Sequence, residues 1–224
     1  MSARSSSSAA QRSHLRVVEG GGDSQRPSFA SDDEIIAAVE RGDNRLAGQL
    51  YDRLIPIVDT TIYRLLGRRE TDHDDLVQCT FEQVVLTITR KKFARACSLT
   101  TWAATVAAHV ALNALRSRTR ERRVVDRHAG YDADAVQPQA SQNPEREVGA
   151  KRDLERLRQN LAAMDPDKAE TVVLHDVLGH ELAEVATTMG VTVAAAQSRL
   201  ARGRRELIAR MEHHDSAGSG GREP

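Results

Sequence analysis

Aromatic residues are scarce in this chain of 224 residues: Phe, Tyr and Trp together make up 3%, and Trp102 is the only tryptophan. The core must therefore be built mainly from aliphatic side chains. The two cysteines, Cys79 and Cys97, lie inside helical patterns and are too few for a disulfide framework, so we expect reduced thiols. No apolar run approaches membrane-spanning length, and the N-terminus lacks the apolar segment of a secretory signal. We therefore expect a soluble, cytoplasmic protein with no membrane insertion.

The usual patterns of catalytic and cofactor sites are also missing. The chain has no glycine-rich phosphate loop and no nucleophile elbow. The histidines and cysteines at His73, Cys79, Cys97 and His109 match none of the compact zinc spacings. We therefore predict a protein that is not an enzyme and that holds neither a metal nor another cofactor.

Hydrophobic residues recur at helical spacing, whereas no stretch shows the alternation and hairpin turns of β-strands. The chain is therefore predicted to be all-α, with two small helical domains, residues 31–123 and 144–211, joined by a flexible linker. Segments with little to bury predict disordered tails at 1–30 and 212–224, and the linker at 124–143.

Several polar residues mark the ends of the predicted helices. Ser31 and Glu34 have the spacing of a capping box, which is worth roughly 1 kcal/mol. Asp72 and Asp165 are predicted to cap two later helices. Pro56 should bend the helix that contains it, because the proline ring clashes with the preceding turn.

Basic and acidic residues are equal in number, 32 of each, but they are segregated along the chain. Because local clusters set the field that a ligand meets, a net charge of zero does not exclude a polyanionic partner. Five arginines within eight residues exceed what a helix C-terminus gains from its dipole, and they favour a nucleic-acid backbone as the partner. The basic clusters are Arg116, Arg118, Arg120, Arg122, Arg123 and residues 199–210, and the acidic clusters are 32–34, 72–75 and 132–134.

Residues 179–210 have the pattern of two short helices joined by a tight turn. Apolar residues recur at helical spacing from Leu182 to Met189, and Gly190 follows, where a glycine enters the left-handed region at little cost. The second run has small residues early and arginines late, which is typical of a DNA-binding helix-turn-helix. A surface helical hairpin with a solvated basic face is the alternative.

A polar stripe lies opposite the apolar face of the helix predicted from residue 72. Asp75, Gln78 and Glu82 form it at positions i, i+3 and i+7. By itself this stripe indicates only a solvated surface. The apolar face is expected to contain Leu76, Val77, Thr80, Phe81, Val84, Val85 and Ile88.

Four segments carry a resemblance to a known family. They read LYDRLIPIVDTTIYRLLG at 50–67, DHDDLVQCTF at 72–81, SLTTW at 98–102, and LGHELAEVATTMGVTVAAAQSRLARGRREL at 178–207. In order and spacing the first three resemble region two, and the last resembles region four, of the RNA polymerase sigma factors of the extracytoplasmic-function (ECF) type.

The resemblance implies three sets of contacts. The polar stripe would dock on the clamp helices of core RNA polymerase, through Asp75, Leu76, Gln78, Phe81 and Glu82. The minus-ten element of promoter DNA would meet Lys91, Lys92, Phe93, Arg95, Trp102, His109, Asn113 and Arg116, because a flipped base needs a stacking partner and positive charge. The minus-thirty-five element would meet Ala194, Ala195, Gln197, Ser198 and Arg199 near the bases, with Arg202, Arg204 and Arg205 on phosphates. Trp102 as part of the core is an equally open reading.

The chain departs from the family's usual residues at four positions. Cys79, Val85, His109 and Glu181 stand where the family commonly has Glu, Trp, Asn and a small hydroxyl residue. The loop before Phe93 is also longer than usual, which suggests an altered minus-ten preference.

The function implied by the resemblance is that of a sigma factor, which binds core polymerase, recognises promoter DNA and promotes strand opening. An anti-sigma factor is a further candidate partner. The alternative is a stand-alone helix-turn-helix transcriptional regulator, which would not need core polymerase to bind DNA.

Overall fold

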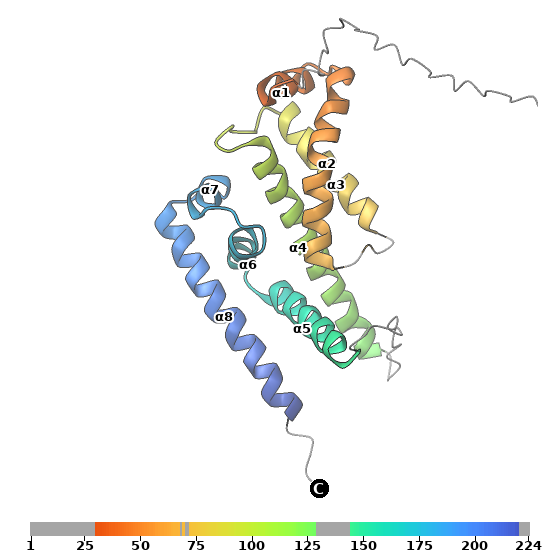
Figure 1. Cartoon of the computed structure of the whole chain (residues 1–224), viewed down its shortest axis with the longest axis vertical. Coiled ribbons are helices and arrows are strands. Elements are labelled where there is room, and N and C mark those ends of the chain that lie inside the picture. The colour runs from red at the N-terminus through yellow and green to blue at the C-terminus, as the bar shows by residue number, and fades with distance from the viewer. Residues whose placement is uncertain (1–29, 68, 70–71, 129–143, 220–224) are drawn as a thin grey trace, which may run out of the picture.

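A computed structural model describes residues 30–67, 69, 72–128 and 144–219, and within these ranges the chain is helical with no strand (Figure 1). The predicted all-α fold class is therefore confirmed. The helices are α1 (Asp32–Glu40), α2 (Asn44–Leu66), α3 (His73–Thr89), α4 (Leu99–His128), α5 (Pro144–Ala163), α6 (Pro166–Val172), the π-helical turn η1 (Val173–Val177), α7 (Leu182–Thr188) and α8 (Val193–Ser219). Most of the predicted N-terminal tail and linker lies outside the described residues.

Helices α1 to α4 form the first domain, in which α2 and α4 lie side by side and α1 and α3 pack against them (Figure 1). The α2 residues Leu54, Val58 and Ile62 are fully buried. Across from them α4 buries alanines, including Ala107 and Ala111, whose small side chains let the two backbones approach closely. The core of this domain is therefore aliphatic, as the scarcity of aromatic residues predicts.

The first helix begins as predicted, with a capping box. The Glu34 amide donates to Ser31 Oγ at 3.3 Å, and the Ser31 amide donates to Glu34 Oε2 at 2.8 Å. These bonds satisfy backbone donors that have no partner inside the helix. α2 continues as a single helix through Pro56, so the proline does not end it.

Helices α5 to α8 form the second domain, in which α5, α6 and α7 pack against α8. Asp165 caps α6 as predicted, because its Oδ1 accepts a hydrogen bond of 3.2 Å from the Lys168 amide. Gly190, at φ +66°, makes the turn between α7 and α8. Where α8 crosses α6, Gly203 leaves no room for a side chain, since a Cβ there would lie 2.8 Å from Val172 Cγ2.

The two domains pack on each other, with α4 lying along α5 and reaching α6 and η1 (Figure 1). Buried residues from both sides, including Leu115 of α4 and Leu161 of α5, belong to one continuous hydrophobic cluster. Among the described residues, no helix is long and apolar enough to cross a membrane.

Four features differ from the sequence predictions. α4 runs to His128, five residues past the predicted linker boundary at 123, and α8 runs to Ser219, into the predicted tail at 212–224. Asp72 precedes α3 but makes no side-chain cap; its carboxylate instead accepts two bonds from Arg118 Nη2, at 2.7 and 2.8 Å. Those bonds lower the pKa of Asp72.

Val85, expected on the buried face, is exposed, because α3 is covered by neighbouring helices on one side only.

Candidate functional site

The polar stripe of α3 lies on the surface of the first domain. Asp75, Gln78 and Glu82 are exposed, and Gln78 Nε2 donates to Glu82 Oε1 at 3.0 Å. Leu76 and Phe81 are partly buried beneath the stripe. The Phe81 ring also meets Tyr51 of α2, with their centroids 4.7 Å apart, so these aromatic groups hold α3 in place on α2.

An open apolar groove continues this face toward the end of α3. Val85 and Leu86 are 38% and 47% exposed, and they line the groove with Gln78, Phe81, Glu82 and Thr89. Sequence reasoning did not assign a role to Leu86. The signal was present in the run Val84–Val85–Leu86, because three consecutive apolar residues on a helix span about 200° and cannot all face one core.

The loop between α3 and α4 holds four of the predicted minus-ten residues. Lys91 and Lys92 are exposed, and the Phe93 ring packs on Trp102 of α4 with centroids 4.5 Å apart. Lys91 and Arg95 both have φ of +54°, a backbone strain that non-glycine residues rarely accept. Arg95 Nη1 is paired with Asp33 Oδ1 of α1 at 2.7 Å, which anchors the loop in this conformation.

Both Phe93 and Trp102 are partly buried against the core. Trp102 is thus partly buried and packs against the core, while its stacking on a base stays a prediction. A base that reached this pair could stack on it.

The other three minus-ten candidates lie further along α4, where His109 and Arg116 come near carboxylates of the second domain. His109 Nδ1 is 3.6 Å from Glu170 Oε2 of α6. Arg116 Nη1 donates to Asn113 Oδ1 at 3.0 Å, while Arg116 Nε and Nη2 are buried without hydrogen-bond partners. Burial lowers the pKa of Arg116, against the opposing effect of the carboxylates of Glu170 and Asp165.

Helix α8, the second helix of the predicted helix-turn-helix, presents its first turns to solvent. Ala194 and Gln197 are exposed, whereas Ala195 and Ser198 are partly buried. Arg202 folds back on its own helix, with Nη2 donating to Ser198 Oγ at 2.7 Å. Arg205 is exposed beside it.

Two arginines of α8 are held by carboxylates of the same domain. Arg199 Nη2 is paired with Asp167 Oδ2 of α6 at 2.7 Å. Arg204 makes a two-pronged contact with Asp176 of η1, including Nε to Oδ2 at 2.9 Å, and this hydrogen bonding raises its pKa. Sequence reasoning missed both acidic partners, because they lie 32 and 28 residues away in the chain.

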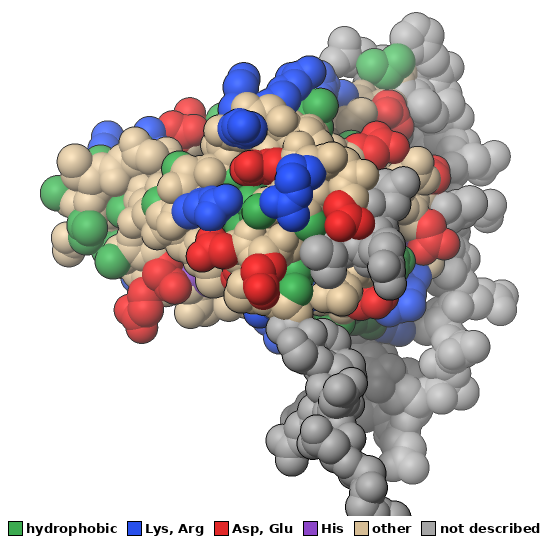
Figure 2. All heavy atoms as spheres, turned by 90° about the horizontal axis from the view of Figure 1, so that it is seen from above, with side chains coloured by type: hydrophobic (Ala, Val, Ile, Leu, Met, Phe, Trp, Pro, Cys, Tyr) green, Lys and Arg blue, Asp and Glu red, His purple; other side chains and the backbone are tan. Residues whose placement is uncertain are grey.

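Basic and acidic side chains are interspersed on the end of the molecule seen in Figure 2. Cys79 and Cys97 are free thiols. Within the part of the chain that the structure describes, no cluster of His, Cys, Asp and Glu could hold a metal ion.

Comparison with known proteins finds a family match for each of the two domains. A family model described as Sigma-70 region 2 matches residues 50–121, and one described as Sigma-70, region 4 matches residues 154–207. The RNA polymerase sigma factor CnrH of Cupriavidus metallidurans is 30% identical over 187 residues, which cover 80% of this chain and 94% of CnrH. The ECF RNA polymerase sigma factor SigC of Mycobacterium tuberculosis is 28% identical over 194 residues, covering 84% of this chain and 98% of SigC. The chain belongs to the ECF family of RNA polymerase sigma factors.

A solved structure of CnrH in complex with the cytosolic domain of CnrY is similar to this sigma factor with a TM-score of 0.48 and 23% identity. The match covers 81% of this chain and 97% of that one. The family is one of transcription initiation factors rather than enzymes, and its partners are core RNA polymerase and promoter DNA. The stand-alone regulator is therefore not favoured, since the relatives match across both domains and nearly their whole length.

The contact between His109 and Glu170 makes the stability of this sigma factor depend on pH. Interaction with the Glu170 carboxylate raises the pKa of His109, whereas partial burial of the ring and the charge of Arg116 act in the opposite direction. A pKa that is higher in the folded state stabilises the fold fully below the ordinary histidine value of about 6.5. The contribution is lost as the pH rises through the higher, folded-state pKa.

We therefore expect His109→Asn to lower the free energy of unfolding by up to about 1 kcal/mol at acidic pH, and by less at alkaline pH, because the pair is half exposed. Urea unfolding of both proteins at about pH 5.5 and about pH 8.5 measures this difference. A cost of the substitution that grows with pH would contradict the assignment.

Proposed function

We propose that this sigma factor docks on core RNA polymerase through the exposed face of α3 and places two separate DNA-binding surfaces on a promoter. The observation that carries the proposal is the α3 face itself. A polar stripe of Asp75, Gln78 and Glu82 lies beside an open groove in which Leu86 is 47% exposed. One helix thus exposes both polar and apolar groups, a combination that is typical of a protein–protein interface.

The surface formed by the α3–α4 loop and the start of α4 is the proposed minus-ten reader. Phe93 and Trp102 supply a stacking surface, and Lys91 and Lys92 supply positive charge for a single strand. Binding an unstacked base there offsets the few kcal/mol that unpairing costs. This surface would therefore help to open the duplex.

The first turns of α8 are the proposed minus-thirty-five reader. Ala194 lets the helix approach a major groove, and Gln197 projects an amide that can bond to a base edge. The pairing of Arg199 with Asp167 orients that guanidinium before DNA arrives. Arg202 and Arg205, free of any contact to a carboxylate in the bonds described, are the proposed phosphate contacts, and Arg204 would first have to leave Asp176.

Further proposals concern the limits of the two domains, the location of the protein in the cell and a regulatory partner. The domain limits 31–123 and 144–211 are proposed as functional units, and the protein is proposed to act in the cytoplasm, where its polymerase and promoter partners are. An anti-sigma factor is a further proposed partner, on the family resemblance of the sequence.

Run-off transcription tests the proposal as a whole. Core polymerase supplied with this chain should start at members of a promoter panel, and Asp75→Ala and Gln78→Ala should reduce both initiation and capture of the polymerase. If capture were unaffected by either substitution while the chain bound duplex DNA tightly alone, the stand-alone regulator would be the better description.

Two arginines of α8 should respond differently to substitution. Arg199→Ala should cost about 1–3 kcal/mol at the minus-thirty-five element and relax sequence preference there, because it removes a base contact. Arg202→Ala should weaken all sequences alike and reduce the salt slope by about one phosphate contact. Binding assays on matched and mismatched promoters at several salt concentrations separate the two. Equal, sequence-independent losses would show that the assignment of roles is mistaken.

A further inference from the structure

A cavity of about 260 Å³ lies where the turn between η1 and α7 meets α2 and α4. Apolar and polar side chains line it together, and they are Pro56, Ile57, Ala104 and Leu178 with Thr60, Thr61, Arg64 and His180. Sites for drug-sized ligands have volumes of roughly 300–1,000 Å³. The cavity is therefore large enough for a small metabolite.

Among the residues that the structure describes, two polar atoms of this lining are buried without a hydrogen-bond partner. Thr61 Oγ1 belongs to a fully buried residue, and His180 Nε2 to a side chain that is 17% exposed. The other ring nitrogen, Nδ1, is 3.9 Å from Glu184 Oε2, which is too far for a hydrogen bond, so the ring can carry its proton on Nε2. Because an unpaired buried polar group costs free energy, two of them at one cavity indicate that a ligand supplies their partner.

His180 is fixed in position by its own backbone. Its amide donates to the Leu174 carbonyl oxygen at 3.0 Å, and its carbonyl oxygen accepts a bond of 2.8 Å from His175 Nδ1. Gly179, at φ +77°, makes the turn that precedes it, a conformation that glycine adopts at little cost. This side of the cavity is thus formed before a ligand arrives, so little ordering opposes binding.

Arg64 supplies a cation that forms no ion pair in the described part of the chain. It lies one turn of α2 beyond Thr60, so both side chains are on the same face of that helix. The acidic residues near the lining in sequence have other partners: Asp59 Oδ2 is 2.6 Å from Arg69 Nη2, and Asp176 is held by Arg204. The positive charge at the cavity is therefore not neutralised by the chain itself.

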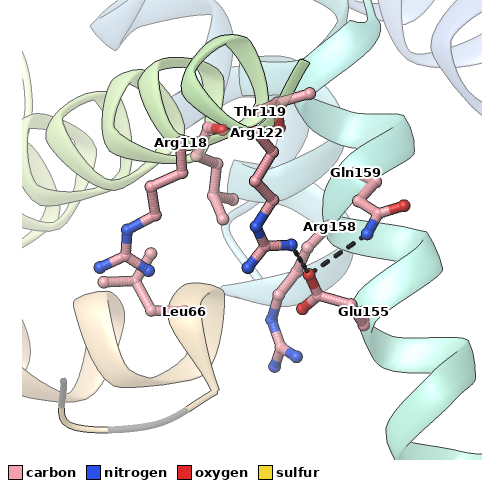
Figure 3. Close-up of a pocket in the computed structure, with 8 residues that line it drawn as sticks. Leu66, Arg118, Thr119, Arg122, Glu155, Arg158 and Gln159 are labelled. Carbon is pink, nitrogen blue, oxygen red and sulfur yellow. Dashed lines mark hydrogen bonds and ion pairs between the residues drawn. The ribbon is translucent and has the colours of Figure 1, made fainter. Parts of the chain in front are cut away.

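The contact between α4 and α5 is the opposite case. Figure 3 shows Arg122 reaching toward Glu155, with Nη1 and Oε1 2.6 Å apart. Gln159 donates to the same carboxylate oxygen at 3.3 Å, so the chain provides both the anion and its hydrogen bonds there. The cavity beside His180 has a cation and hydrogen-bonding atoms but no carboxylate in its lining. A carboxylate from outside the chain would complete it.

We propose that this cavity binds a small molecule that has an apolar body and one carboxylate. The body packs on Ile57 and Leu178, while the carboxylate accepts hydrogen bonds from Thr61 and His180 and pairs with Arg64. A phosphate monoester fits less well, because it carries about −1.5 to −2 charge and the lining has one full cation. None of these residues belongs to the proposed polymerase or promoter contacts, so the site is independent of that function.

Calorimetric titration of the full chain with hexanoate tests the proposal, and hexylamine is the control ligand with the same body and the opposite charge. We expect one saturable site for hexanoate and at least about tenfold weaker binding of hexylamine, because the group that the cavity holds is anionic. The nitrogen NMR signal of His180 Nε2 should shift in the same titration. Equal affinities for the two ligands, or no saturable binding of hexanoate at millimolar concentrations, would overturn the proposal.

Substitutions place the bound hexanoate in this cavity. Arg64→Gln should weaken binding by at least about fivefold, because it removes the cation. Arg90→Gln is the matched control and should leave binding unchanged, since Arg90 is also exposed but lies at the end of α3, outside the cavity. Thr60→Phe should block the cavity, because Thr60 is an exposed part of its lining, and circular dichroism checks that this variant is folded.

Thr61→Val distinguishes a binding role from a structural one. It should raise the Tm of the free protein, because it removes an unpartnered buried hydroxyl, and yet weaken hexanoate binding. A higher Tm with unchanged affinity, together with equal affinities of Arg64→Gln and Arg90→Gln, would show that hexanoate binds elsewhere and would overturn the proposal.

Discussion

Arginine in place of Leu86 is expected to weaken capture of core RNA polymerase by at least about thirtyfold, which corresponds to about 2 kcal/mol. Leu86 is 47% exposed in the groove that continues the proposed docking face of α3. A partner that covers this groove would bury the new guanidinium without a designed counterion, and desolvating an unpaired charge is costly. The fold should be little affected, because the side chain already faces solvent.

The control for Leu86→Arg is Ile208→Arg on α8, where the original side chain is 57% exposed. It makes the same chemical change at an exposed apolar position on the other domain. Pull-down of core polymerase over a concentration series, with thermal unfolding of each variant, separates docking from stability. Equal capture by the two variants would place the docking face elsewhere.

The second large effect concerns stability. Gly203→Ala is expected to lower the free energy of unfolding by about 1–3 kcal/mol, because overpacking a filled contact forces neighbouring groups to move. The added Cβ would lie 2.8 Å from Val172 Cγ2 and 3.2 Å from the carbonyl oxygen of Lys168. The carbonyl belongs to the backbone of α6 and cannot rotate away, so α8 itself must shift. Because α8 carries the proposed DNA reader, binding to the minus-thirty-five element should weaken as well.

Gly48→Ala is the matched control, since Gly48 also lies inside a helix, α2, but has open space where a Cβ would be placed. There the substitution should raise the free energy of unfolding by up to about 1 kcal/mol, through the higher helix propensity of alanine. Urea unfolding of both variants measures the two changes in the free energy of unfolding, which should be opposite in sign. A stabilising Gly203→Ala would mean that α6 and α8 separate more easily than their packing indicates.

Much of the local structure could be predicted from the sequence. The capping box at Ser31, the Asp165 cap and the Gly190 turn each depend on residues within a few positions of one another, so the pattern alone identifies them. The exposure of Asp75 and Gln78 also follows from helical spacing. The docking role proposed for the stripe could not be obtained from its spacing and rests on the family resemblance of the sequence.

By itself, then, the sequence determined the helical class, the order of the elements and the helix-turn-helix. Only the tertiary structure decided which charges meet: Arg199 with Asp167, Arg122 with Glu155, and His109 with Glu170. It also decided which side of α3 the neighbouring helices cover, so that Ile88 is fully buried and Leu86 on the other side stays 47% exposed. The physical reason is the distance along the chain over which each kind of contact acts. A helix and its caps are set by contacts three or four residues apart, whereas ion pairs between helices depend on how the separate helices pack, and helical periodicity does not show which charges will meet.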